Sequence, residues 1–255
     1  VVLDVRGTLN IVGGEINMNS KGFRGGGLSE VCPNSCSFSQ NNTDYFYAHP
    51  NYRSSLKGEG IANLIVGKER GRGAQANGGG GGNDHNAGGG GGSNLSSGGI
   101  GSRNNEPGGF NCKGFNPGEA GRVLNSSAGA RLFMGGGGGS GHGNNGATGG
   151  CPANGGSTAG TAGGGIIIVM AGTLNANGDA FRTTATFAGT ANGDGAGGGG
   201  SGGTVLLDVT NYSGTPFTIH ATGGNGGATS CFAQNRCYGP GGGGGGGAVY
   251  VKTGV

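Results

Sequence analysis

The chain has 255 residues, of which 72 are glycine, 11% are charged and 32% are apolar. Ordinary globular domains carry about 45–50% apolar and about 25% charged residues, so a wide core of side chains is excluded. Collagen is excluded because glycine follows no strict three-residue spacing, and no apolar run is long enough for a transmembrane helix. A net charge of +3 is too small to indicate a nucleic-acid or membrane partner.

Segments rich in β-branched residues and bounded by glycine predict strands. In chain order these are Val1–Val5, Ile61–Val66, Ile166–Met170, Thr183–Ala188, Val205–Val209, Phe217–Ala221 and Ala248–Val251. The quartet Gly7-Thr8-Leu9-Asn10 recurs as Gly172-Thr173-Leu174-Asn175, and Val1–Val5 reads like Val205–Val209, which indicates stacked units. No apolar stripe has the 3.6-residue period of a helix.

Pure glycine runs lie between these strands, at Gly78–Gly82, Gly88–Gly92, Gly135–Gly139, Gly197–Gly200 and Gly241–Gly247. Fixing a residue's backbone costs about 1–2 kcal/mol, and glycine has no side chain to offset that cost. Glycine can adopt the three-residue extended helix of polyproline, and such helices can pack closely and hydrogen bond to one another. The sequence therefore predicts an all-β fold with packed polyglycine II helices, repeating strands and glycine tracts, and no α-helix.

We expect one glycine-rich domain over residues 1–255, with loop insertions near 28–57, 102–122 and 228–240. The chain begins at Val1 without methionine and both begins and ends on an expected strand. These features favour a module cut from a larger secreted protein whose leader has been removed.

The six cysteines are even in number, and two pairs of them lie close in sequence. Pairing close neighbours gives disulfides Cys32–Cys36 and Cys231–Cys237, which leaves Cys112 for Cys151. Free thiols and a zinc site are the alternatives, although no C-x2-C pair is present. Disulfides would staple loops of a chain with a thin core and would indicate an oxidising, extracellular setting.

Two histidines follow glycine runs at matching positions, His85 after Gly78–Gly82 and His142 after Gly135–Gly139. With Asp84 they are weak candidates for a metal site, and the alternative is that they cap the ends of the tracts. Asp179 and Asp194 each follow Asn-Gly, so they indicate turns or, less directly, calcium as the only possible cofactor.

Catalytic patterns are missing, so we expect no enzyme. Ser140 and His142 are too close in sequence for a nucleophile and its base, and no orienting acid accompanies them. Arg70-Gly71-Arg72-Gly73 is similar to RNA-binding arginine–glycine segments but stands alone beside six cysteines, so no nucleic-acid partner is expected.

The best candidate recognition surface is the asparagine-rich stretch of residues 38–56, which holds the least glycine. Its candidate binding residues are Tyr45, Phe46, Tyr47, Tyr52 and Arg53, together with the neighbouring Phe38 and His49. Aromatic and arginine side chains on a loop of a rigid scaffold are typical of binding sites. The alternative is that these rings cover a sheet and form the small core.

Three strings carry a resemblance to a known class of protein. They are Gly22-Phe23-Arg24-Gly25-Gly26, Lys57-Gly58-Glu59-Gly60-Ile61, and Gly71-Arg72-Gly73 followed by the glycine run Gly78–Gly82 and His85. The chain resembles glycine-rich, adhesin-like surface domains of secreted bacterial proteins of the Bacteroidota type. Its expected architecture is also similar to the tail-fibre adhesins of T-even-like phages.

The resemblance to surface domains implies type IX secretion and a non-catalytic structural or adhesive module at the cell surface. Its partner would be a surface glycan, a protein receptor or a neighbouring module of the same protein, with no membrane insertion. The alternatives are a phage tail-tip receptor-binding adhesin and an ice-binding protein, the latter indicated only by Thr183-Thr184-Ala185-Thr186.

Overall fold

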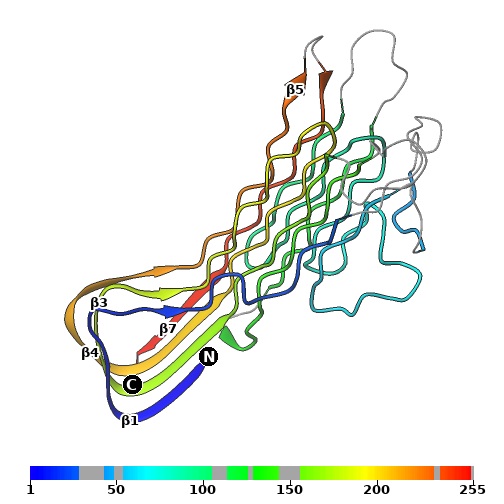
Figure 1. Ribbon diagram of the computed structural model, residues 1–255. Helices are drawn as coiled ribbons and strands as arrows, with labels where there is room; N and C mark the ends of the chain where they lie inside the picture. Colours follow the sequence, from blue (N-terminus) through cyan, green and yellow to red (C-terminus); the bar gives the residue numbers. More distant parts are fainter. Residues whose placement is uncertain are drawn as a thin grey trace.

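The computed structural model describes residues 1–28, 43–48, 54–104, 114–125, 129–143, 156–232 and 236–253. Figure 1 shows a curled sheet that holds both chain ends and, continuing from it, a bundle of extended glycine-rich segments. Strands dominate the regular elements of these residues and no α-helix is among them, which confirms the expected all-β class. In the same ranges no helix has the length and apolar character needed to cross a membrane.

The main sheet is parallel, with the strand order β1-β3-β4-β7. Its strands are β1 (Val2–Ile11), β3 (Ile166–Arg182), β4 (Thr204–His220) and β7 (Ala248–Thr253), while β2 (Ile16–Asn17) pairs with the end of β3. A separate antiparallel pair joins β5 (Cys231–Phe232) to β6 (Arg236–Cys237). Four of the expected strands therefore lie in one sheet, in the order of the chain.

The recurring quartet lies in register on neighbouring strands. Thr8 of β1 is opposite Thr173 of β3, and Leu9 and Asn10 are opposite Leu174 and Asn175. The Asn175 side-chain amide donates to the Asn10 side-chain oxygen at 2.9 Å. The quartet therefore recurs because its two copies occupy equivalent positions on neighbouring strands of a parallel sheet.

The long strands fold back on themselves, and the apolar core lies inside the bend. Figure 1 shows β1, β3 and β4 running out to a common bend and returning. Gly178 and Gly214 have φ angles of +63° and +96°, where a Cβ would be strained, and the register between β3 and β4 shifts there. The buried side chains inside the curl are Ile11, Ile167, Val169, Leu174, Phe181, Val205, Leu207 and Val209.

Two of the expected strands are wrong. Ile61–Val66 forms no strand, and Ile61, Ile65 and Val66 are exposed, because no neighbouring strand covers them. Thr183–Ala188 lies beyond the end of β3, where Thr183, Ala185 and Ala188 donate to residues 220–225 outside the sheet ladder. The expected strand Phe217–Ala221 is the end of β4, which closes at His220.

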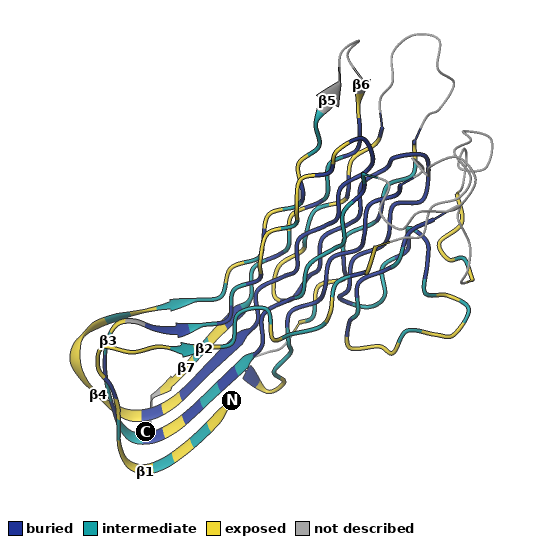
Figure 2. Ribbon diagram, in the orientation of Figure 1, coloured by how far each residue is buried: buried dark blue, intermediate teal, exposed yellow. Residues whose placement is uncertain are grey.

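The glycine segments form a second interior, which is built from backbone. Residues 78–94 and 195–203 are buried, as the dark centre of the bundle in Figure 2 shows. Most of them are glycine, so little of this interior consists of side chains. Most of their N–H groups donate to carbonyls of other segments, at 2.8–3.0 Å. Backbone polar groups are thus satisfied between segments, as burial requires.

The backbone N–H groups of segment 135–142 donate in turn to three neighbouring segments, with a period of three residues. Every third residue turns to the same neighbour, in three sets: Gly135, Gly138 and Gly141 to Gly164, Thr161 and Thr158; Gly136, Gly139 and His142 to Ser93, Gly90 and Ala87; Gly137 and Ser140 to Glu59 and Leu56. Acceptor numbers fall as donor numbers rise, so these neighbours run antiparallel to it. The segment is therefore held from three sides at once.

This close approach requires glycine. A Cβ added to Gly137 would overlap the Arg24 carbonyl, and one added to Gly244 would overlap the Gly200 carbonyl. Gly243, one residue away, is exposed, and a Cβ there would have no heavy atom nearer than 3.8 Å. Adjacent positions of one tract therefore differ in whether they have space for a side chain.

We expect Gly244→Ala to destabilise the fold by about 2–4 kcal/mol, because it overpacks backbone and disturbs a hydrogen bond. Gly243→Ala is the matched control and should change the free energy of unfolding by less than about 0.5 kcal/mol. Denaturant melts of both variants measure the difference. Equal melts would show that the tract does not pack as described.

Candidate functional site

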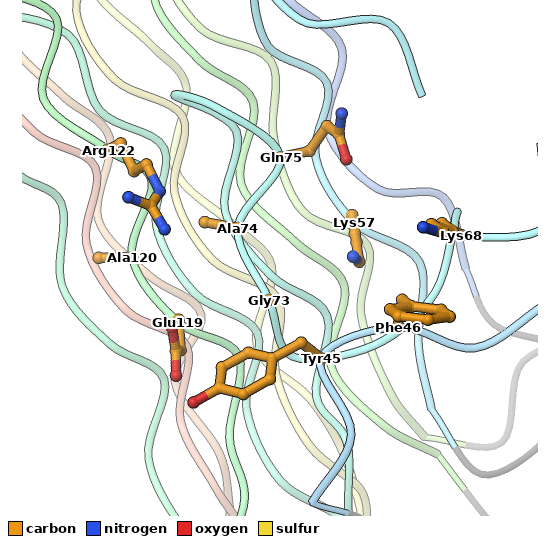
Figure 3. A pocket seen from close by; sticks show the side chains of 10 residues that line it. All are labelled: Tyr45, Phe46, Lys57, Lys68, Gly73, Ala74, Gln75, Glu119, Ala120 and Arg122. Atoms are coloured by element: carbon orange, nitrogen blue, oxygen red, sulfur yellow. The ribbon is translucent and has the colours of Figure 1, made fainter. Parts of the chain in front are cut away.

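The candidate site is a pocket of about 330 Å³ on the flank of the glycine bundle. Figure 3 shows the aromatic rings of Tyr45 and Phe46 along one side of it and the cationic side chains of Lys57, Lys68 and Arg122 around it. The remaining lining residues are Gly73, Ala74, Gln75, Glu119 and Ala120. The pocket therefore combines aromatic faces with a cluster of positive charge.

Short backbone contacts hold the aromatic segment against the bundle. Tyr47 pairs with Arg70 through reciprocal N–H···O bonds of 2.9 and 3.3 Å, and the Gly73 N–H donates to the Tyr45 carbonyl at 3.0 Å. Gly71, with a φ of +111°, lies so close to Phe46 that a Cβ there would meet the Phe46 Cα at 2.6 Å. Residues 45–47 are thus held by close contacts between backbone atoms, as the glycine segments of the bundle are.

Each ring also carries a cation on one face. The Lys68 ammonium lies 4.5 Å from the centre of the Phe46 ring, and the Arg72 guanidinium lies 4.5 Å from the centre of the Tyr45 ring. Arg72 also contacts Glu119 at 3.5 Å. These contacts order the rings, which are themselves about half exposed at 53% for Tyr45 and 50% for Phe46.

The half exposure shows that Tyr45 and Phe46 are not members of the buried core. Tyr47 belongs to the same segment but does not line the pocket. The other two candidate binding residues, Tyr52 and Arg53, lie outside the described residues, as do Phe38 and His49.

Sequence reasoning missed the cationic half of the pocket. Lys57, Lys68 and Arg122 come from separate stretches of the sequence. Lys57 opens one of the strings that carry the resemblance, but that resemblance gives it no binding role. The available signal was the three-residue period, which places Glu119 and Arg122 on one side of their segment. Both residues line the pocket.

The candidate metal residues are engaged with the protein itself. One carboxylate oxygen of Asp84 accepts the N–H groups of Phe115 and Asn116 and the side-chain amide of Asn116, at 3.0, 2.9 and 2.6 Å. The Asn86 N–H donates to His142 Nδ1 at 3.3 Å, and the Asn86 amide nitrogen lies 3.2 Å from His85 Nε2. No three histidine, cysteine or acidic side chains of the described residues are grouped to hold a metal ion.

Other candidates fall in the scaffold. Asp179 lies within β3 opposite Thr218, because the bulge at Gly178 is part of the strand and not a turn between strands. Asp194 and Arg70 are buried, and Arg70 donates to the Ser54 carbonyl. Thr183, from the threonine cluster, is also fully buried.

Of the six cysteines, Cys32, Cys36, Cys112 and Cys151 lie outside the described residues. Cys231 and Cys237 are directly opposite each other in the β5–β6 pair. Comparisons with models of known protein families, with curated proteins and with solved structures found no match.

We expect the buried His85 to make the fold acid-sensitive. Burial, and then the nearby His142, lower the pKa of His85 from 6.5 to about 3. Its contribution to stability is therefore complete above pH 6.5 and is lost as the pH falls from 6.5 towards 3, by about 1.4 kcal/mol per pH unit.

Urea melts at pH 7 and pH 5 measure this effect, with His85→Gln as the variant that cannot take up a proton. The wild type should lose about 2 kcal/mol more than the variant over this interval. An identical loss in both proteins would contradict the assignment to His85.

Proposed function

We propose that this chain is an extracellular, non-catalytic adhesive module of a larger bacterial surface protein or filament. Its glycine tracts are polyglycine II helices that form a rigid scaffold, and a loop on that scaffold binds a surface glycan or a protein receptor. The observation that carries the proposal is the pocket in which two half-exposed aromatic rings meet three cationic side chains on a support built from backbone.

The threefold rotation of hydrogen bonds supports the helical form of the tracts. A helix of three residues per turn points every third N–H in one direction, as the donors of segment 135–142 do. None of the glycines of this segment has a φ between +20° and +160°, which agrees with the left-handed form near −75°. An isolated strand ladder would instead alternate between two directions.

The rigidity of the scaffold supports a role in recognition. A binding loop on a fixed support loses less conformational freedom when its partner binds. Tyr45 and Phe46 offer large ring surfaces with few rotatable bonds, and such residues dominate binding interfaces.

The β5–β6 pairing supports an oxidising environment. Directly opposed residues of an antiparallel pair have Cα atoms about 4.5–5.5 Å apart, which lies within the range that a disulfide spans. The backbone register of Cys231 and Cys237 is therefore compatible with the disulfide that the sequence predicts.

The test replaces Tyr45 and Phe46 together by alanine and measures attachment to a panel of surface glycans and to whole cells. We expect attachment to fall at least tenfold while the melting transition stays within a few degrees, because both rings are half exposed. Phe187→Ala, at an exposed ring outside the pocket lining, is the matched control and should attach normally.

Loss of folding together with attachment would mean that the two rings are structural. Unchanged attachment in a folded double variant would show that adhesion does not use this loop.

A further inference from the structure

We propose that the pocket binds a carboxylated sugar, a uronic acid unit of an acidic glycan, whose carboxylate pairs with Lys57. The inference rests on the proposed function, because it names the ligand of the same pocket. It is carried by a nearly buried lysine in the pocket lining whose ammonium group makes no hydrogen bond or ion pair with any described residue.

Lys57 is only 6% exposed, yet it lines the pocket. No hydrogen bond or ion pair of its ammonium group is found with any described residue. In Figure 3 its side chain lies between Ala74 on one side and Phe46 and Lys68 on the other. Holding a positive charge on a nearly buried side chain is costly when the charge has no direct partner, and an anionic ligand in the pocket would offset that cost.

The charge around Lys57 favours an anion. Lys68 and Arg122 line the same pocket, and Glu119 is the one carboxylate among the lining residues. Glu119 already contacts Arg72. Like charges gathered in a concave site raise the local concentration of anions, so the pocket attracts a carboxylate from solution.

The other lining groups suit a saccharide. A volume of about 330 Å³ lies at the lower end of the range for small-molecule sites, about 300–1,000 Å³, and fits a single sugar unit better than a peptide. The Gln75 amide is held by donation to the Asn63 carbonyl at 2.9 Å, and its oxygen lies on the Lys57 side in Figure 3. That oxygen can accept a sugar hydroxyl, and the Tyr45 and Phe46 rings offer surfaces for a sugar face.

The ammonium must be charged for this pairing, which gives the interaction a pH dependence. Burial, followed by repulsion from Lys68, lowers the pKa of Lys57 to about 8, while Glu69 acts in the opposite direction. Affinity for a carboxylate is therefore highest near pH 7 and falls as the pH rises through 8. The other charged or titratable groups around Lys57 are Tyr45, Arg72, Glu119 and Arg122.

The experiment is a calorimetric titration of the purified chain at pH 7 with three probes. These are an oligogalacturonate, its methyl ester, which has the same sugar without the charge, and sodium sulfate, which has charge without the sugar. We expect the oligogalacturonate to bind at least tenfold more tightly than either of the other probes.

Lys57→Met should weaken oligogalacturonate binding at least tenfold and abolish its decline between pH 7 and pH 9. Lys252→Gln removes an exposed cation from β7, outside the pocket lining, and should change binding less than twofold. If Lys57→Met does not fold, Arg122→Gln, at an exposed lining residue, should still weaken binding at least threefold.

Equal binding of the acid and its ester would overturn the carboxylate assignment, while dependence on Tyr45 and Phe46 would keep the proposed adhesion intact. Sulfate bound as tightly as the oligogalacturonate would overturn the sugar assignment and leave a general anion site. Attachment of the wild type to cells without binding of any probe would also overturn this inference, and it would leave the proposed function standing.

Discussion

The hydrogen bond between the backbone N–H of one glycine segment and the carbonyl of its neighbour is the interaction on which the rest of this molecule depends. A side-chain core is small here, because the apolar cluster is confined to the curled sheet. Beyond the sheet, burial is achieved by backbone on backbone, and a Cβ at most tract positions would overlap a carbonyl. The high glycine content is therefore the condition for burial and not a sign of disorder.

The sheet and the bundle are one hydrogen-bonded system. β3 ends at Arg182 and β4 begins at Thr204, and the segments continuing from them stay in contact: the Gly203 N–H donates to the Thr183 carbonyl at 2.8 Å. The register that the sheet fixes through side-chain packing is thereby carried into segments that have no side chains to fix it. This coupling explains how a glycine segment, which lacks any intrinsic register, obtains a unique set of partners.

The sequence predicted the strand class, the absence of α-helix and the positions of the four main strands, because these depend on local β-branched composition and on repeated residues such as Thr8 and Thr173. It failed at Ile61–Val66, since an apolar run forms a strand only where a neighbour can pair with it. It also predicted a separate strand at Thr183–Ala188, a segment that has strand propensity but lies beyond the end of β3 and meets glycine-rich partners. Local strand propensity does not reveal which segments lie beside Ile61–Val66 and Thr183–Ala188 in the fold.

The candidate site likewise has one part that the sequence predicted and one part that it did not. Tyr45 and Phe46 were visible as an aromatic cluster in a polar stretch, and the pocket includes both. Lys57 and Arg122 were not visible, because they reach the pocket from segments that only the bundle brings together. In a chain with 11% charged residues, three cations around one small pocket make an uneven distribution of charge.

That uneven distribution follows from the way in which the scaffold is stabilised. Because backbone hydrogen bonds hold the bundle, the side chains on its flank are not needed for burial. A lysine such as Lys57 can then occupy a position where an ordinary domain would place an apolar residue. The stability of the bundle is thus largely independent of the side chains on its surface. Residues of the loops and of the flank can be substituted, and the ligand specificity changed, without disturbing the fold. A scaffold of this kind suits a protein whose task is to present a binding site, since the site and the support are under separate physical constraints.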